Sequence, residues 1–219
     1  MVLICSVSGL VAQDNKRPAV GILLDNTGSL RLQLSREIEL AQAVVRQIDD
    51  KAAISVFGFG TDPKADQLSR FAIGADCSGD RVEIGKLLDS IETVGGRTTL
   101  IDSINSAVDR LGKGRPPKCL EPSESSLILI TDGEDRSSST KEKDLLAALK
   151  APSIRVYAIG LMDDLSEEGG LFGSSPKQKA KDLLTKLTKE AGGRAVFPKK
   201  KDPADQVAKE LQIGVPTSK

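Results

Sequence analysis

The segment Asp25-x-Thr27-x-Ser29 presents one carboxylate and two hydroxyls at two-residue spacing. These side chains offer only oxygen atoms, which are the ligands that hard divalent cations such as Mg²⁺ prefer. An apolar run over residues 20–24 precedes the segment. A run that is apolar at every position predicts a strand buried on both faces, as in a parallel sheet. Asp25 would then emerge at the carboxyl end of the sheet, where open α/β sheets bind their ligands.

Two further segments carry oxygen ligands at comparable places. Thr98 stands at the start of a predicted helix, and Asp132 follows a second fully apolar strand, predicted over residues 126–131. If this strand lies next to the first one, Asp25 and Asp132 lie side by side at the edge of the sheet. Each segment alone is also typical of a turn or a helix N-cap, because Asp, Ser and Thr are common there. Their joint occurrence at element ends favours a metal site.

Predicted strands and helices alternate along the chain. Strands are predicted at residues 20–25, 52–59, 67–73, 126–131, 154–160 and 194–197, and helices at residues 29–50, 80–91, 100–111, 139–150, 176–191 and 203–211. The strand at residues 67–73 is more polar than the others, which predicts an antiparallel edge strand. The alternation predicts an α/β, Rossmann-like fold: a doubly wound, mostly parallel sheet of about six strands with helices on both faces.

The composition excludes several functional classes. The chain contains no histidine, which removes Ser-His-Asp triads, histidine general bases and histidine-ligated zinc. The 31 Lys and Arg residues balance the 31 Asp and Glu residues. Because proteins that bind nucleic acid usually carry a basic excess, we expect no nucleic-acid partner. No stretch of the mature chain reaches the length of an apolar membrane span, so none is expected.

The pattern resembles the von Willebrand factor A (VWA) domain with its metal-ion-dependent adhesion site (MIDAS). That family shows D-x-S-x-S after the first strand, a threonine in a later loop and an aspartate after the fourth strand. The resemblance covers the chain after residue 18 and is closest to bacterial VWA-related proteins. The segments shared with them are GRTTLIDSI at residues 96–104, YAIGL at residues 157–161 and AGGRAVFP at residues 191–198.

The resemblance implies a metal site formed by Asp25, Thr27, Ser29, Thr98 and Asp132, without catalytic residues. The two hydroxyls of the first segment would bind the metal directly, the two aspartates directly or through water, and Thr98 directly when a ligand is bound. Thr27 stands where the family usually has serine, so its extra methyl group must be accommodated. The implied cofactor is Mg²⁺, or else Mn²⁺ or Ca²⁺. An acidic residue of a protein partner would complete the coordination, which predicts a non-enzymatic adhesion or scaffold domain.

Two alternative functions stay open. A Mg²⁺-dependent, phosphatase-like hydrolase would use Asp25 as its nucleophile, with Asp163 and Asp164 as a later acidic pair. Such enzymes carry a second acid two residues after the nucleophile, but Thr27 occupies that position, so the general acid is missing. The other alternative is a VWA scaffold that binds partners without a metal.

The N-terminal segment and the cysteines bear on the cellular compartment in which the protein is found. Residues 1–18 form the lead-in, residues 19–213 the expected VWA domain and residues 214–219 a tail. Apolar residues before Gln13 resemble a signal peptide with its cleavage site, which predicts export to the periplasm or beyond. No basic residue precedes them, so a non-cleaved segment and a cytoplasmic location stay open. After cleavage Cys77 and Cys119 would remain, either bridged in an oxidising compartment or as two thiols.

Overall fold

Strands and helices alternate along the chain in the computed structural model, which describes residues 17–59, 77–94, 97–112, 124–150, 154–169 and 173–214. The strands are β1 (Ala19–Leu24), β2 (Ala53–Gly58), β3 (Ser125–Thr131), β4 (Ile154–Gly160) and β5 (Ala195–Val196). The helices are the 3-10 turn η1 (Gly28–Leu30), α1 (Leu34–Gln47), α2 (Arg81–Asp89), α3 (Leu100–Leu111), α4 (Glu142–Leu149), α5 (Pro176–Glu190) and α6 (Ala204–Glu210).

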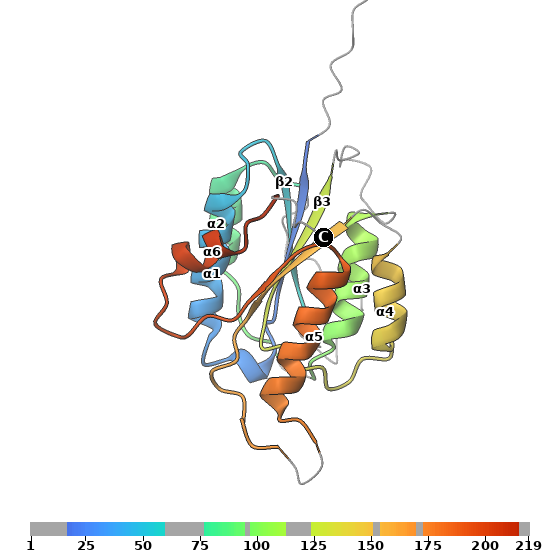
Figure 1. Cartoon of the computed structure of the whole chain (residues 1–219). Coiled ribbons are helices and arrows are strands. Elements are labelled where there is room, and N and C mark those ends of the chain that lie inside the picture. The colour runs from blue at the N-terminus through green and yellow to red at the C-terminus, as the bar shows by residue number, and fades with distance from the viewer. Residues whose placement is uncertain are drawn as a thin grey trace, which may run out of the picture.

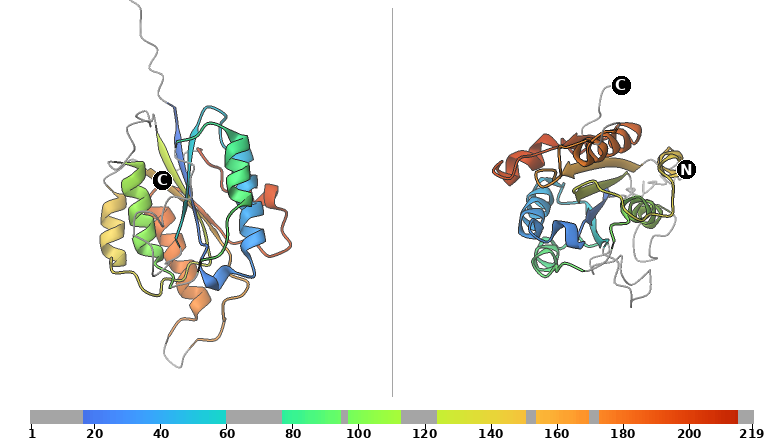
Figure 2. Two further views of the ribbon diagram at one scale, coloured as in Figure 1. Left: turned by 180° about the vertical axis from the view of Figure 1, so that it is seen from behind. Right: turned by 90° about the horizontal axis from the view of Figure 1, so that it is seen from below.

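The described strands form one parallel sheet in the order β2-β1-β3-β4-β5. Every residue of β1, β2 and β3 is buried, because helices cover both faces of the sheet (Figures 1 and 2). This burial explains why the strands are apolar at nearly every position instead of alternating with polar residues. The predicted α/β, doubly wound architecture is therefore confirmed.

Two hydrophobic cores flank the sheet. On one face, α1, α2 and α6 pack around strand residues that include Ile22 and Ile128. On the other face, α3, α4 and α5 pack around Leu127 and Leu129. Successive residues of a strand point to opposite faces, so a single apolar strand such as β3 supplies both cores. The end-on view in Figure 2 shows the two layers of helices with the sheet between them.

Two helices begin later than the sequence predicts. A helix is predicted from residue 29, but η1 ends at Leu30 and α1 begins only at Leu34. Ser29 lies within the 3-10 turn η1, where its Oγ is 2.9 Å from the Oγ1 of Thr27. The helix predicted from Ser139 begins at Glu142. The hydroxyl and the backbone N–H of Ser139 both donate to Asp102 of α3, so Ser139 does not cap this helix.

Several predictions fall outside the described residues. The antiparallel strand at residues 67–73 lies there, although Ser78 forms an antiparallel bridge with Ile54 at the outer edge of β2. Cys119 lies there too, so its disulfide with Cys77 stays a prediction. The same holds for the signal peptide within residues 1–16. Across the described ranges, no helix combines the length and the hydrophobicity that a membrane span requires.

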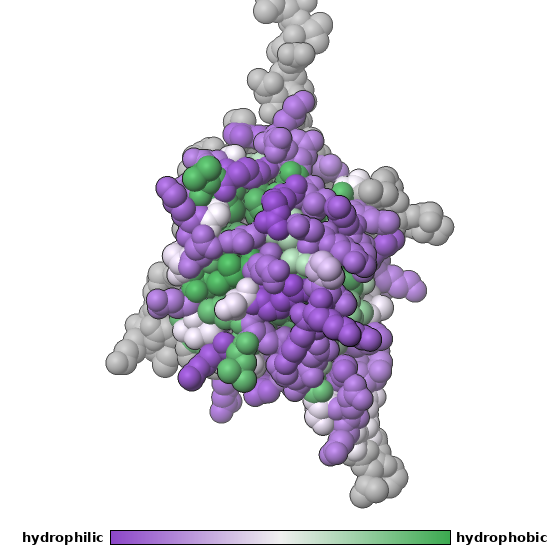
Figure 3. Space-filling view, turned by 90° about the vertical axis from the view of Figure 1, so that its left-hand side faces the viewer, coloured by the Kyte–Doolittle hydropathy of each residue, from purple (hydrophilic) through white to green (hydrophobic). Residues whose placement is uncertain are grey.

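The surface on the side of α1, α2 and α6 is mainly hydrophilic, with separate hydrophobic areas (Figure 3). Among the described residues, Leu32 and Val82 are the large hydrophobic side chains that are most exposed. Leu32 lies in the loop between η1 and α1, close in sequence to Ser29, and is 93% exposed. The loop that carries the first oxygen-bearing segment therefore also presents an apolar side chain to solvent.

Candidate metal centre

Asp25 and Asp132 emerge from neighbouring strands at the carboxyl edge of the sheet. β1 and β3 pair in register as far as Leu24 and Ile130, and the N–H of Asp25 donates to the carbonyl of Ile130 at 3.1 Å. Thr131 Oγ1 donates to Asp25 Oδ2 at 2.8 Å, which links the two strand ends. Asp25 and Asp132 are 0% and 3% exposed. The parallel pairing thus brings two buried carboxylates to one place.

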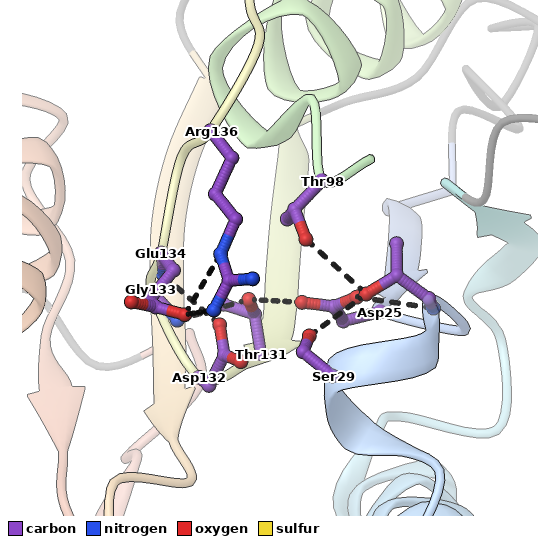
Figure 4. Close-up of polar contacts among 9 residues, drawn as sticks. Asp25, Ser29, Thr98, Thr131, Asp132, Gly133, Glu134 and Arg136 are labelled. Atoms are coloured by element: carbon purple, nitrogen blue, oxygen red, sulfur yellow. Dashed lines mark hydrogen bonds and ion pairs between the residues drawn. The ribbon is translucent and has the colours of Figure 1, made fainter. Parts of the chain in front are cut away.

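Thr27 joins the three oxygen-bearing segments. Its Oγ1 donates to Asp25 Oδ1 at 2.6 Å. The same oxygen lies 2.9 Å from Ser29 Oγ and 3.3 Å from Thr98 Oγ1. Figure 4 shows Thr98 and Ser29 reaching the neighbourhood of Asp25 from opposite sides. Thr27 is fully buried, so the loop accommodates the methyl group that distinguishes it from serine.

Hydrogen bonds connect the loop that carries Thr98 to the loop that follows β3. The Thr98 carbonyl accepts a hydrogen bond from the backbone N–H of Arg136 at 3.0 Å. In the first turn of α3, Asp102 accepts the backbone N–H groups of Ser139 and Thr140, both at 2.8 Å. Burial alone would raise the pKa of Asp102, but the hydrogen bonds from Thr140 and Ser139 outweigh it and lower that pKa. These bonds hold Thr98 at a fixed place relative to Asp132.

The side chain of Asp135 adds a further hydrogen bond between the loop after β3 and the start of α3. Its Oδ1 accepts the backbone N–H of Ile101 at 3.2 Å and the hydroxyl of Ser138 at 2.5 Å. Asp135 therefore satisfies one of the free N–H groups at the start of α3. Thr99, at the N-cap position of this helix, forms no side-chain cap hydrogen bond. The cap is supplied by a residue from another loop, which the sequence alone does not reveal.

Three buried acids, Asp25, Asp132 and Glu37, lie close together at the site. Burial, and then the negative charge of Asp132, raises the pKa of Asp25 from 3.8 to about 7. Burial also raises the pKa of Asp132. Glu37 of α1 is fully buried, and its Oε1 accepts the N–H of Asp25 at 2.6 Å. Burial and the charge of Asp25 raise the pKa of Glu37 well above its usual value.

A metal ion at this place would be held through oxygen alone. Among the residues that the structure describes, no group of three or more His, Cys, Asp or Glu side chains is arranged to hold a metal ion. The two aspartates would therefore need the neutral hydroxyls of Thr27, Ser29 and Thr98 as further ligands. Such a ligand set carries two negative charges and suits a divalent hard cation.

The family model for the von Willebrand factor type A domain matches residues 20–208, from the start of β1 into α6. The chain belongs to the VWA domain family. This confirms the resemblance that the three sequence segments indicate. Among curated proteins, no match is found for the chain.

Solved structures share the fold of this VWA domain at low sequence identity. An aerotolerance-related membrane protein from Bacteroides fragilis, with multiple mutations to serines, has a TM-score of 0.61 and 19% identity, over 89% of this chain and 96% of that one. BatB from Bacteroides thetaiotaomicron has the same TM-score and identity, over 89% and 97%. The pilus adhesin SpaC from Lactobacillus rhamnosus GG, in an open conformation, has a TM-score of 0.62 and 13% identity, over 91% and 30%.

Four polar residues around the candidate site of this VWA domain were not predicted as site residues from the sequence: Glu37, Thr131, Glu134 and Arg136. Glu37 could have been noticed, because it lies one helical turn before Ala41 on the buried stripe of α1, where an acid is unusual. Thr131 is the last residue of a predicted apolar strand, so its side chain was not expected to contact Asp25. Glu134 and Arg136 lie in a polar loop, where nothing in the sequence distinguishes them from solvated side chains.

Proposed function

We propose that this VWA domain binds a divalent cation, Mg²⁺ or else Mn²⁺ or Ca²⁺, and uses it to hold an acidic residue of a protein partner. The ligands would be Asp25, Thr27, Ser29, Thr98 and Asp132. Domains of this family generally act as protein-interaction modules. The cation would supply an open coordination position for the partner's carboxylate, and the chain would supply a fixed set of oxygen atoms. The result is binding, not catalysis.

The observation that carries this proposal is a pair of buried acids without a counter-ion. In the described part of the chain, neither Asp25 nor Asp132 lies within ion-pair distance of a Lys or Arg side chain. Buried carboxylates in proteins are usually paired with a cation or coordinate a metal. The pKa of Asp25 is raised first by burial and then by repulsion from the charge of Asp132. A divalent cation between them would remove that repulsion.

The spacing of the hydroxyl oxygens supports the same proposal. Oxygen ligands about 2.0–2.1 Å from an octahedral Mg²⁺ are about 2.9–3.0 Å apart along each edge. The Oγ1 of Thr27 lies 2.9 Å from the Oγ of Ser29 and 3.3 Å from the Oγ1 of Thr98. The three hydroxyls are therefore spaced so that they could share one cation with only small movements of their side chains.

The hydrolase alternative gains nothing from the arrangement of Asp163 and Asp164. Asp163 accepts the backbone N–H of Lys200 at 2.7 Å, and Asp164 forms an ion pair with the side chain of the same lysine. Both acids are exposed. Position 27 holds a buried threonine, which cannot act as a general acid at neutral pH.

Calorimetric titration with Mg²⁺ and Mn²⁺ tests the proposal directly. The wild-type domain should bind either cation at one saturable site. Asp25→Asn, which keeps the size of the side chain but removes its charge, should weaken binding at least ten-fold. The control is Asp163→Asn, which removes an exposed acid from a neighbouring loop and should leave the affinity unchanged.

Each titration is repeated in 10 mM acetate, which stands in for the partner's carboxylate and could be needed before the cation stays bound. Circular dichroism verifies that each variant is folded. A folded wild-type domain that binds no cation with or without acetate would contradict the proposal and leave metal-independent scaffolding as the function. A cation affinity that Asp25→Asn leaves unchanged would place the metal elsewhere.

A further inference from the structure

A cavity of about 410 Å³ opens beside the candidate metal centre. Two proposed ligands, Ser29 and Asp132, line it together with Arg136. Leu161 and Leu165 contribute apolar surface to the same cavity. A group that enters here would meet the open side of the metal centre, a guanidinium and a small apolar wall. The acids Glu134 and Asp164 line the cavity as well, so an acidic side chain that enters depends on the cation and on Arg136 for its binding.

Arg136 is held over this cavity by an acid of the same loop. Its Nε donates to Glu134 Oε2 at 3.1 Å, and its Nη2 donates to the same oxygen. Glu134 is itself held, because its backbone N–H donates to Asp132 Oδ1 at 2.9 Å. The backbone of Arg136 is fixed by its bond to the Thr98 carbonyl. The guanidinium is thus positioned before any ligand arrives.

The third guanidinium nitrogen of Arg136 is available. In the described part of the chain, Nη1 has no hydrogen-bond partner, and it points toward the side on which Asp25 and Ser29 lie (Figure 4). The Arg136 side chain is 57% exposed, so a ligand can reach it. The negative charges of Asp132 and Asp25 also act on Arg136. The arginine is therefore close enough to the centre to influence what binds there.

We propose that Arg136 is a specificity-determining residue for the partner, binding the same acidic side chain that the metal binds. The inference rests on the proposed function. Asp25 and Asp132 would neutralise the cation, while Glu134 accepts only from Nε and Nη2 of Arg136, which leaves Nη1 able to donate to a ligand. A carboxylate can take one oxygen to the cation and the other to the free N–H groups of the guanidinium, which are well suited to it. A neutral amide would lack this second interaction.

Replacing Arg136 should have opposite effects on the two ligands. Arg136 repels the cation but attracts the carboxylate. In Arg136→Gln we expect the Mn²⁺ affinity to rise about two-fold, because the weak repulsion between the guanidinium and the cation in water is removed. We expect the affinity for acetate to fall at least five-fold. A loop that is merely damaged would lose affinity for both, so the opposite signs separate recognition from structural support.

Three comparisons test the inference. Mn²⁺ binding is measured by electron paramagnetic resonance, and binding of acetate or of the neutral acetamide is measured by NMR titration with Mg²⁺ and with chelator. Arg136→Lys keeps the positive charge but lacks the planar guanidinium with its several N–H donors. It should bind acetate with intermediate affinity. The control Arg46→Gln removes an exposed arginine from the last turn of α1 and should leave both affinities unchanged.

The outcomes distinguish this inference from the function on which it rests. Opposite shifts in Arg136→Gln, with acetate preferred over acetamide only in Mg²⁺, would support the role of Arg136. Metal binding with unchanged acetate affinity, or with both affinities reduced, would overturn that role and leave the proposed function standing. A wild-type domain that binds no Mn²⁺ even in acetate would overturn both.

Discussion

The hydroxyl of Thr27 touches the carboxylate of Asp25 and the hydroxyls of Ser29 and Thr98. We expect Thr27→Ser to retain cation binding, because it keeps this oxygen. Thr27→Val has nearly the same shape without the oxygen, so it should abolish binding and lower the free energy of unfolding by about 1 kcal/mol. Calorimetry and urea denaturation measure the two effects. Equal cation affinity in both variants would show that this hydroxyl is not a ligand.

Glu37 makes the stability of the metal-free domain dependent on pH. Its pKa in the folded state lies well above the usual 4.5, so the folded protein keeps a proton that the unfolded chain releases between these two values. The free energy of unfolding should therefore fall as pH rises through this window, by up to about 1.4 kcal/mol per pH unit for one group. Glu37→Gln should remove this contribution.

Urea denaturation between pH 5 and pH 7 in chelator measures the effect of Glu37. The difference in stability between wild type and Glu37→Gln should become less favourable to wild type as pH rises. Glu39→Gln, on the same helix but exposed, should follow the wild-type curve. If the free energy of unfolding of Glu37→Gln depended on pH in the same way as that of wild type, Glu37 would have the same pKa in the folded and unfolded states.

The five proposed ligands could be named from the sequence because each stands in a motif at a predicted element end. Glu37 could be recognised only as an unusual acid on the buried stripe of α1, and nothing in the sequence placed either Glu37 or Arg136 at the site. Their positions depend on how α1 packs beneath β1 and on how the loop after β3 folds over the site. Both are outcomes of tertiary packing, which residue spacing does not contain. The same reason explains why the cavity beside Asp132 has no signature in the sequence.

At the scale of elements, α3 and the loop after β3 behave as one structural unit. The carboxylate of Asp102 accepts the N–H groups of Ser139 and Thr140. We expect Asp102→Ala to lower the free energy of unfolding by about 1–2 kcal/mol, since hydrogen bonds to a charged group are lost. The Mn²⁺ affinity should also fall several-fold, because Thr98 and Asp132 would no longer be fixed relative to each other.

Asp109→Ala provides the matched control for Asp102→Ala, since Asp109 lies on the same helix and is exposed. It should change neither stability nor Mn²⁺ affinity. If Asp102→Ala destabilises the domain but leaves Mn²⁺ affinity at the wild-type value, the loop contacts do not position the ligands. Both quantities come from one preparation, by urea denaturation and by Mn²⁺ titration.

Elements were predicted best where local periodicity decides them. The predicted helix at residues 100–111 and the predicted strand at residues 154–160 match α3 and β4 to the residue. The predicted α-helix starts at residues 29 and 139 were wrong, because Ser29 lies in the 3-10 turn η1 and Ser139 bonds to Asp102 of α3. The strand order also lay beyond the sequence, since it depends on which apolar strands lie next to each other.

For the whole molecule, the proposed cation should act as a stabilising ligand. At a free Mg²⁺ concentration about 100-fold above its dissociation constant, the gain would be about 2.7 kcal/mol. For a chain of this size that raises the unfolding temperature by about 5–10 °C. Differential scanning calorimetry should show this shift in wild type and not in Asp25→Asn. Equal shifts in both proteins would indicate unspecific binding of the salt.

The sheet order has a consequence for the newly synthesised chain. β1 pairs with β2, which follows soon after it, but its other neighbour is β3, which begins only at Ser125. While the chain is still emerging from the ribosome, one long edge of β1 therefore has no strand beside it. Such apolar edges readily pair with other chains. Chaperones that shield nascent polypeptides should matter most for this domain between the synthesis of β2 and that of β3.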